Sequence, residues 1–130
     1  MLKRIDAVVL FVTDLEEAKT FYRDKVGLRM KMEAPGFAEF ELDNTTIGLL
    51  DVGTAQNLIS KDAVAFTRPS GARCQVAVFV DDVRSTYEEL KARGVDFIKP
   101  PTDQSWGQRT ANFQDPDGNL WEISQWLKGT

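Results

Sequence analysis

The hydrophobic and polar positions of this chain follow one pattern that occurs twice. Residues 7–15 read AVVLFVTDL, and residues 75–83 read QVAVFVDDV. Aligned without a gap, the two stretches share valine, phenylalanine, valine and aspartate at matching places. The apolar, β-branched run is typical of a strand, and the shared acidic residue, Asp14 or Asp82, is a good N-terminal cap for a helix. The chain therefore contains an internal repeat.

A helical pattern follows each capping aspartate. Apolar residues recur at helical spacing from Leu15 to Val26 and from Val83 to Leu90, with charged residues between them. A glycine that favours a left-handed C-terminal cap ends each pattern. The aromatic residues of these helices are interpreted as core because they share the apolar stripe. The capping glycines are Gly27 and Gly94. The aromatic residues interpreted as core are Phe21, Tyr22 and Tyr87.

Each predicted helix precedes strand-like runs separated by turn signals such as Pro35-Gly36 and Asp115-Pro116-Asp117-Gly118. The predicted strands are 28–33, 37–42 and 45–50 in the first half, and 95–98, 109–114 and 120–125 in the second. The repeat unit is thus a βαβββ module. The first module spans 1–51 and the second spans 74–130, and together they form one α+β domain.

The stretch 52–73 has no counterpart in the repeat and is rich in small and polar residues. It is interpreted as a linker between the modules, with a short strand or turn around 63–67. A flap over a pocket is the alternative.

Composition narrows the class of partner. The chain has 130 residues and a net charge of -4, which argues against nucleic acid or an anionic membrane as the main partner. The acidic balance favours a cationic or neutral ligand, and a solvated surface that aids solubility is the alternative reading. No apolar run is long enough to span a bilayer.

Two residue types restrict the chemistry. The single cysteine, Cys74, forms no disulfide framework and indicates a reducing cytosol. A strand that begins near Ile5 leaves no room for a signal peptide, so we expect a cytoplasmic protein. The absence of histidine excludes Ser-His-Asp and Cys-His catalysis and histidine-based zinc or iron sites.

Two motifs carry a family resemblance. A strand followed by Val-Thr-Asp-Leu, a helix reaching Phe-Tyr, and Val-Gly-Leu resembles the opening of glyoxalase and bleomycin-resistance-type sequences. The segment 113–123, FQDPDGNLWEI, is similar to the most recognisable part of that family, the vicinal-oxygen-chelate group. The resemblance implies two βαβββ modules that form a cup-shaped, mostly antiparallel sheet with helices outside. It also implies a homodimer.

The resemblance further implies where a metal would lie. Metal-dependent relatives place a ligand on the first and the last strand of each module. The corresponding positions here are Ala7, Gly48, Gln75 and Glu122. Only Glu122 is a strong ligand, and neighbouring Asp51 has the wrong strand parity to replace a missing one. The chain is therefore expected to hold no metal and no other cofactor.

Strand alternation predicts the lining of the cup. The inward-facing side chains are mostly apolar, with a few polar groups, as in sites for small organic molecules. The expected ligand-binding residues are Gln75, Phe79, Asn112, Glu122 and a loop tryptophan, Trp106, that can stack on a planar ligand.

Two functions are compatible with this lining. The first is a metal-free binding protein that sequesters an aromatic or cationic compound, as bleomycin-resistance proteins do. The second is a lyase, isomerase or dioxygenase of the same group, with Glu122 as the catalytic base or as a lone remaining metal ligand. The expected partners are a small organic molecule and a second copy of the chain.

Overall fold

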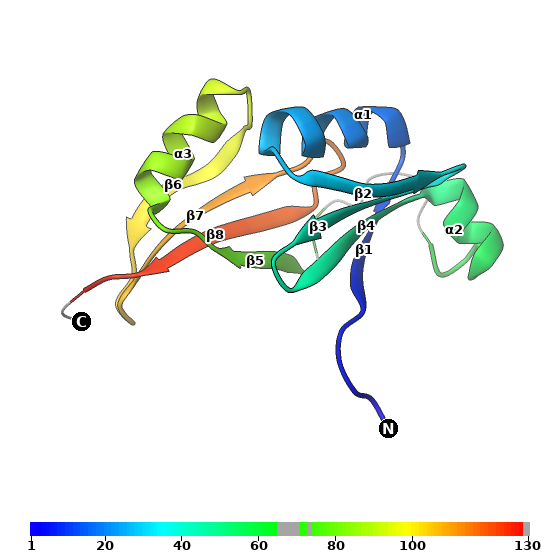
Figure 1. Cartoon of the computed structure of the whole chain (residues 1–130), viewed down its shortest axis with the longest axis horizontal. Helices are drawn as coiled ribbons and strands as arrows, with labels where there is room; N and C mark the ends of the chain where they lie inside the picture. The colour runs from blue at the N-terminus through cyan, green and yellow to red at the C-terminus, as the bar shows by residue number, and fades with distance from the viewer. Residues whose placement is uncertain (65–70, 73, 129–130) are drawn as a thin grey trace. The chain divides into compact units, whose positions relative to one another are not determined.

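The computed structural model describes residues 1–64, 71–72 and 74–128. The chain consists of two compact units, Met1–Pro69 and Ser70–Thr130 (Figure 1). Each unit contains one four-stranded sheet with a helix packed on it. No helix within the described ranges is both long and apolar enough to cross a membrane.

The first unit follows the predicted βαβββ order and adds a helix at its end. The elements are β1 (Ala7–Val12), α1 (Leu15–Thr20), the π-helical turn η1 (Phe21–Val26), β2 (Arg29–Ala34), β3 (Phe37–Leu42), β4 (Thr45–Asp51) and α2 (Val52–Leu58). The strand order in the sheet is β1-β4-β3-β2. β1 pairs with β4 in parallel, whereas the other two pairs are antiparallel.

The second unit has the same topology. Its elements are β5 (Gln75–Phe79), α3 (Val83–Ala92), β6 (Phe97–Asp103), β7 (Gln108–Gln114) and β8 (Leu120–Trp126). The strand order is β5-β8-β7-β6, again with one parallel pair, β5 with β8, beside two antiparallel pairs. The predicted fold class, α+β with two βαβββ modules, is confirmed.

The predicted helix caps are confirmed as well. The Oδ1 atom of Asp14 accepts a hydrogen bond from the backbone N–H of Glu17 at 3.0 Å, and Oδ1 of Asp82 accepts one from Arg84 at 3.2 Å. Gly27 has a φ of 85° and Gly94 a φ of 93°. Both lie in the left-handed region that glycine enters at least cost, so each marks the point where the chain leaves its helix.

Strand alternation places one face of each sheet in the core. In β1, Leu10 and Val12 are 7% and 0% exposed, whereas Val9 and Phe11 are 42% and 37% exposed. The buried face of the first sheet packs on α1 and η1, where the Tyr22 ring lies 6.1 Å from that of Phe40. In the second unit, the buried side includes Val83, Leu90, Phe113, Trp121 and Ile123. The predicted alternation, with one face of the first strand on the core and the other turned away from it, therefore holds in both units.

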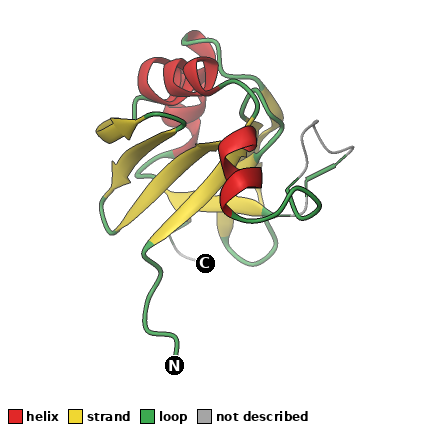
Figure 2. Cartoon of the chain, turned by 90° about the vertical axis from the view of Figure 1, so that its right-hand side faces the viewer, coloured by secondary structure: helices red, strands yellow, loops and turns green. Residues whose placement is uncertain are grey.

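Residues 52–58, placed in the linker by the sequence analysis, form α2 instead. The Asp51 carboxylate caps this helix by accepting a hydrogen bond from the N–H of Thr54 at 3.2 Å. Val52 and Ala55 pack with Leu50 in a small apolar cluster. α2 thus lies beside the strands of the first sheet, and α1 lies above them (Figure 2). The short strand or turn expected at 63–67 falls mostly outside the described residues.

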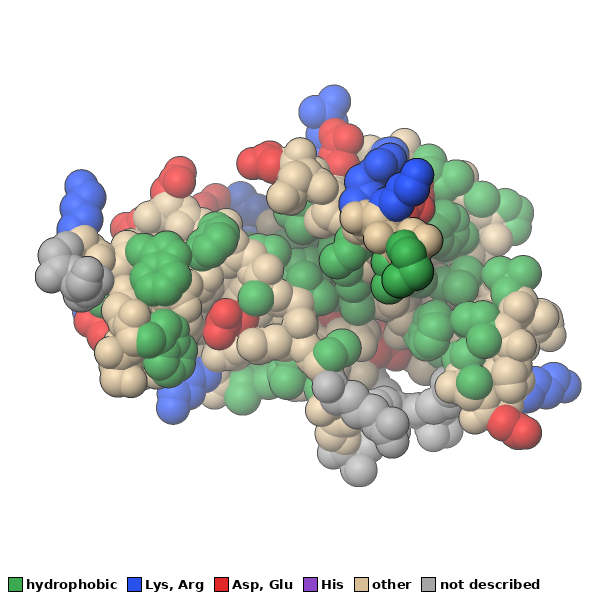
Figure 3. Space-filling model, turned by 90° about the horizontal axis from the view of Figure 1, so that it is seen from below, with side chains coloured by type: hydrophobic (Ala, Val, Ile, Leu, Met, Phe, Trp, Pro, Cys, Tyr) green, Lys and Arg blue, Asp and Glu red, His purple; other side chains and the backbone are tan. Residues whose placement is uncertain are grey.

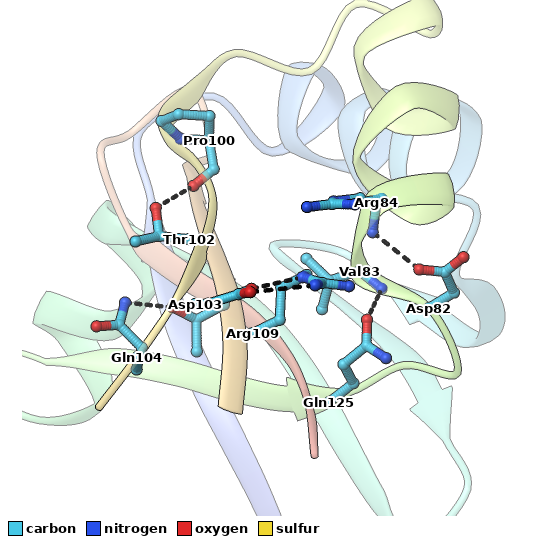
Figure 4. Close-up of polar contacts among 10 residues, drawn as sticks. Asp82, Val83, Arg84, Pro100, Thr102, Asp103, Gln104, Arg109 and Gln125 are labelled. Carbon is cyan, nitrogen blue, oxygen red and sulfur yellow. Dashed lines mark hydrogen bonds and ion pairs between the residues drawn. The ribbon is translucent and has the colours of Figure 1, made fainter. Parts of the chain in front are cut away.

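Side-chain hydrogen bonds in the second unit join a strand to α3 and join two strands to each other (Figure 4). The Gln125 side-chain oxygen accepts a hydrogen bond from the backbone N–H of Val83 at 2.6 Å. Arg109 donates through Nε to Oδ1 of Asp103 at 2.6 Å and through a second nitrogen to Oδ2 at 3.2 Å. This forked ion pair links β7 to β6.

The Asp103–Arg109 pair makes stability depend on pH. The hydrogen bond from Arg109 lowers the pKa of Asp103 below its ordinary value. A carboxyl group with a lower pKa in the folded state stabilises the fold above its unfolded pKa, near 4. This stabilisation is lost as the pH falls through the folded pKa. D103N should therefore show a smaller loss of stability than the parent when the pH drops from about 5 to about 3.

Urea unfolding midpoints at pH 7, 5 and 3 would test this prediction. D96N, at an exposed aspartate outside the ion pair, is the matched control and should follow the parent. Equal acid sensitivity of D103N and D96N would contradict the assignment.

Candidate ligand-binding face of the second sheet

The second sheet has one face that is turned away from its core. We call this face the open face, and it carries side chains from alternate positions of β5, β7 and β8. They are Gln75, Ala77, Phe79, Gln108, Thr110, Asn112, Leu120, Glu122, Ser124 and Trp126. Four of the five predicted ligand-binding residues lie here: Gln75, Phe79, Asn112 and Glu122.

Strand register sorts the open face into rows. Ala77, Glu122 and Asn112 are direct neighbours across three strands. Phe79, Ser124 and Thr110 form the next row, and Trp126 pairs with Gln108 in the row after it. Two residues along a strand span about 7 Å, so the Glu122 row and the Trp126 row are about 14 Å apart.

Exposed aromatic side chains lie beside buried polar residues on this face. Ser124 and Thr110 are short and buried, at 4% and 2% exposure. Phe79 is 73% exposed beside them, and Trp126 is 60% exposed in the adjoining row. Figure 3 shows exposed hydrophobic side chains gathered on the surface that the second unit forms. Thr110 is covered in part by Gln104, whose side-chain nitrogen donates to the Thr110 hydroxyl at 2.9 Å. A flat molecule would therefore contact the exposed rings rather than these two residues.

Trp106 joins this face from the loop between β6 and β7. Its side chain is 59% exposed, and its indole Nε1 donates a hydrogen bond to the side-chain oxygen of Gln108 at 2.8 Å. Because Gln108 pairs with Trp126, the bond brings Trp106 to the Trp126 row. We refer to Phe79, Trp106 and Trp126 as the aromatic group. Within the described part of the chain no ring contact joins these three, so their faces stay available for a ligand.

Glu122 supplies the negative charge of the open face. It is half-buried, and no other described side chain or backbone group forms a hydrogen bond or ion pair with its carboxylate. Its neighbour Asn112 instead donates through Nδ2 to the side-chain oxygen of Gln75 at 3.2 Å. The Gln75–Asn112 pair is thus neutral, and the Glu122 carboxylate has no partner among the described residues.

Sequence reasoning missed two residues of this site, Trp126 and Gln108. The parity of Trp126 with Glu122 and Ser124 in β8 was the available signal, because residues two apart on a strand share a face. No sequence signal marks Gln108, whose role depends on the path of the loop that carries Trp106.

The four positions that hold metal ligands in metal-dependent relatives do not fit a metal here. At Gly48, an added Cβ would lie 3.2 Å from Cε1 of Phe37 and 3.3 Å from Cγ2 of Val9. Those side chains already fill the space that a ligand side chain would need. Ala7 carries no donor, and the Gln75 amide is engaged by Asn112. Over the described ranges, no three His, Cys, Asp or Glu residues lie together as metal ligands.

Comparisons with known proteins agree with this architecture. The sequence model of the Glyoxalase/Bleomycin resistance protein/Dioxygenase superfamily matches residues 4–123, so the chain belongs to that superfamily. The uncharacterized protein YraH of Bacillus subtilis (strain 168) is 32% identical over 124 residues, which are 91% of this chain and 94% of YraH.

Two solved structures are similar over most of their length. A glyoxalase/bleomycin resistance protein/dioxygenase from Nocardioides has a TM-score of 0.88 at 34% identity and covers all of this chain and 87% of its own. A family enzyme from Burkholderia phytofirmans PsJN has a TM-score of 0.80 at 23% identity, covering 94% and 98%. The second likeness concerns the fold alone.

Proposed function

We propose that this protein binds a planar aromatic cation on the open face of the second sheet without a metal, and sequesters it unchanged. The observation that carries the proposal is the unpaired Glu122 carboxylate on the same face as three exposed aromatic side chains. A flat ring gains stacking energy on Trp106, Trp126 or Phe79. A positive charge on that ring gains a cation–π interaction and a carboxylate partner.

The site is suited to holding a ligand for two further reasons. The chain carries a net charge of -4, which raises the concentration of cations near its surface. The open face also combines apolar area with a small number of polar groups, the usual composition of a small-molecule site. Sequestration of this kind would resemble the action of bleomycin-resistance proteins. The site supports a chemical class for the ligand, not one particular compound.

An enzymatic function is the second candidate, and one observation favours it. Glu122 is a half-buried carboxylate with Asn112 beside it, so it has the placement of a general base next to a group that orients a substrate. Such an enzyme would be a lyase or isomerase of the superfamily. It would return a changed product, whereas a sequestering protein releases the same molecule. Mass spectrometry of the ligand after prolonged incubation separates these two functions.

We also propose a homodimer in the cytosol. β5 is an edge strand of the second sheet, and no proline or charged residue interrupts its sequence, QVAVF. The opposite edge strand, β6, contains Pro100 and Pro101, which block strand addition. An edge strand without these blocking residues can pair with the same strand of a second copy. Sedimentation equilibrium measures whether the chain is a dimer. The exposed single thiol of Cys74 fits a reducing compartment.

The binding proposal is tested with a pair of matched compounds, 9-aminoacridinium and neutral acridine, at pH 8. W106A should weaken the binding of both about tenfold, because stacking does not require charge; this is a loss of about 1.4 kcal/mol. E122Q should weaken 9-aminoacridinium to a similar extent and leave acridine nearly unchanged. Isothermal titration calorimetry measures both affinities.

Glu88, an exposed residue of α3, provides the control substitution E88Q, which should bind like the parent. Circular dichroism of each variant checks that the fold is intact. Unchanged affinity in W106A, or equal effects of E122Q on the cation and the neutral compound, would overturn the proposal.

A further inference from the structure

The first unit contains a recess that the proposed function does not use. It has a volume of about 280 Å³ and lies among the segment before β1, strand β2 and the β3–β4 hairpin. The residues that give it chemical character are Arg4, Asp6, Lys31, Glu41, Thr45 and Thr46. All of them belong to the first unit, so the recess is formed by that unit alone.

The lining carries two cations, Arg4 and Lys31, and two carboxylates, Asp6 and Glu41. Arg29, outside the lining, adds a third cation. Glu41 is neutralised from outside by Arg29, whose Nε lies 3.1 Å from Oε1 of Glu41. Lys31 donates only to a neutral group, the Thr46 hydroxyl, through a 3.2 Å hydrogen bond. Within the described residues Arg4 forms no ion pair or hydrogen bond. Two cations therefore face the recess with Asp6 as the one carboxylate not already paired, in a chain whose overall charge is negative.

The Thr46 hydroxyl adds a further donor. The Thr46 hydroxyl accepts from Lys31 and so keeps its own proton to donate. A guanidinium, an ammonium and the Thr46 hydroxyl together supply more donors than the described residues satisfy.

We propose that this recess binds an oxyanion, the carboxylate or phosphate group of a small molecule. Arg4 provides a planar pair of donors that matches either group, and Lys31 provides a point charge held in place by Thr46. The volume lies just below the range of about 300–1,000 Å³ typical of pockets for drug-sized ligands. The ligand is therefore a small organic acid or a phosphate monoester rather than a large polyanion.

The test uses sodium acetate and inorganic phosphate as probes in an NMR titration of the ¹⁵N-labelled full chain. Sodium chloride at equal ionic strength is the reference. Saturable shifts should occur at the amides of Lys31, Thr45 and Thr46 at millimolar concentration. Stronger binding of phosphate would assign a phosphate ligand, and stronger binding of acetate would assign a carboxylate.

K31M should weaken binding at least fivefold. R4Q should do the same, and this substitution lies before the first strand, so it leaves the sheet intact. K25M, at an exposed lysine of η1 outside the recess, is the matched control and should bind like the parent. Shifts identical to those in chloride, or affinities in K31M and R4Q equal to that of K25M, would overturn the proposal. The probes carry no aromatic ring, so the outcome is independent of the binding proposed for the second sheet.

Discussion

D115A is expected to lower the free energy of unfolding by about 3 kcal/mol or more. The Asp115 side chain is 4% exposed and organises the turn between β7 and β8. Its Oδ1 accepts hydrogen bonds from the backbone N–H of Asp117 at 2.9 Å and of Asn119 at 2.8 Å, and its Oδ2 accepts one from the Asn119 side chain at 2.9 Å. Removing the carboxylate leaves these donors without their acceptor in a place that water reaches poorly.

Two comparison variants sharpen this prediction. D115N keeps one side-chain oxygen for the two backbone donors, so it should cost less than D115A. D43A changes an exposed aspartate in the turn between β3 and β4, where the structure shows no comparable set of hydrogen bonds. Urea unfolding followed by circular dichroism measures all three. A loss in D115A no larger than that in D43A would contradict the role given to Asp115.

The turn that Asp115 organises shows why much of the fold could be predicted from the sequence. The segment 113–123 identified the family, and its Asp115-Pro116-Asp117-Gly118 run forms the turn as a local structure closed by its own side chains. The two helix caps and the strand alternation are local in the same sense. Each depends on residues within about four positions along the chain, so the sequence pattern is sufficient to predict them.

Features that depend on distant contacts could not be predicted in this way. α2 was taken for a linker because its small and polar residues have weak periodicity, and its position depends on packing against Leu50. The filling of the space at Gly48 depends on Phe37, a residue of the neighbouring strand. The placement of Trp106 depends on a hydrogen bond to Gln108 across a loop. In each case spacing along the chain says nothing about the partner.

For the candidate site, strand parity predicted which side chains share a face but not how those side chains pair. Gln75, Phe79, Asn112 and Glu122 do share one face. However, the polar pair on that face is Gln75 with Asn112, which leaves Glu122 unpaired. The difference matters for function, because an unpaired carboxylate is available to a cationic ligand and a paired one is not.

Alanine substitutions of Trp121 and Trp126 should have very different effects on stability. The two residues lie five positions apart on β8, so their side chains point to opposite faces of the sheet. Trp121 is 2% exposed, and its ring stacks on that of Phe113 at 5.8 Å with an interplanar angle of 8°. W121A should therefore cost about 3–5 kcal/mol of stability through the cavity it leaves. Trp126 is 60% exposed, so W126A should change stability by less than about 1 kcal/mol.

Binding should show the opposite order. W126A removes a stacking surface from the open face and should weaken 9-aminoacridinium about tenfold while the protein stays folded. W121A, measured at a temperature where it is fully folded, should bind with nearly the parent affinity because its side chain lies on the buried face. Thermal unfolding and calorimetric titration of the two variants measure both quantities. If W121A weakened binding more than W126A did under those conditions, the ligand would have to contact the other face of the sheet, and the open face would not be the site.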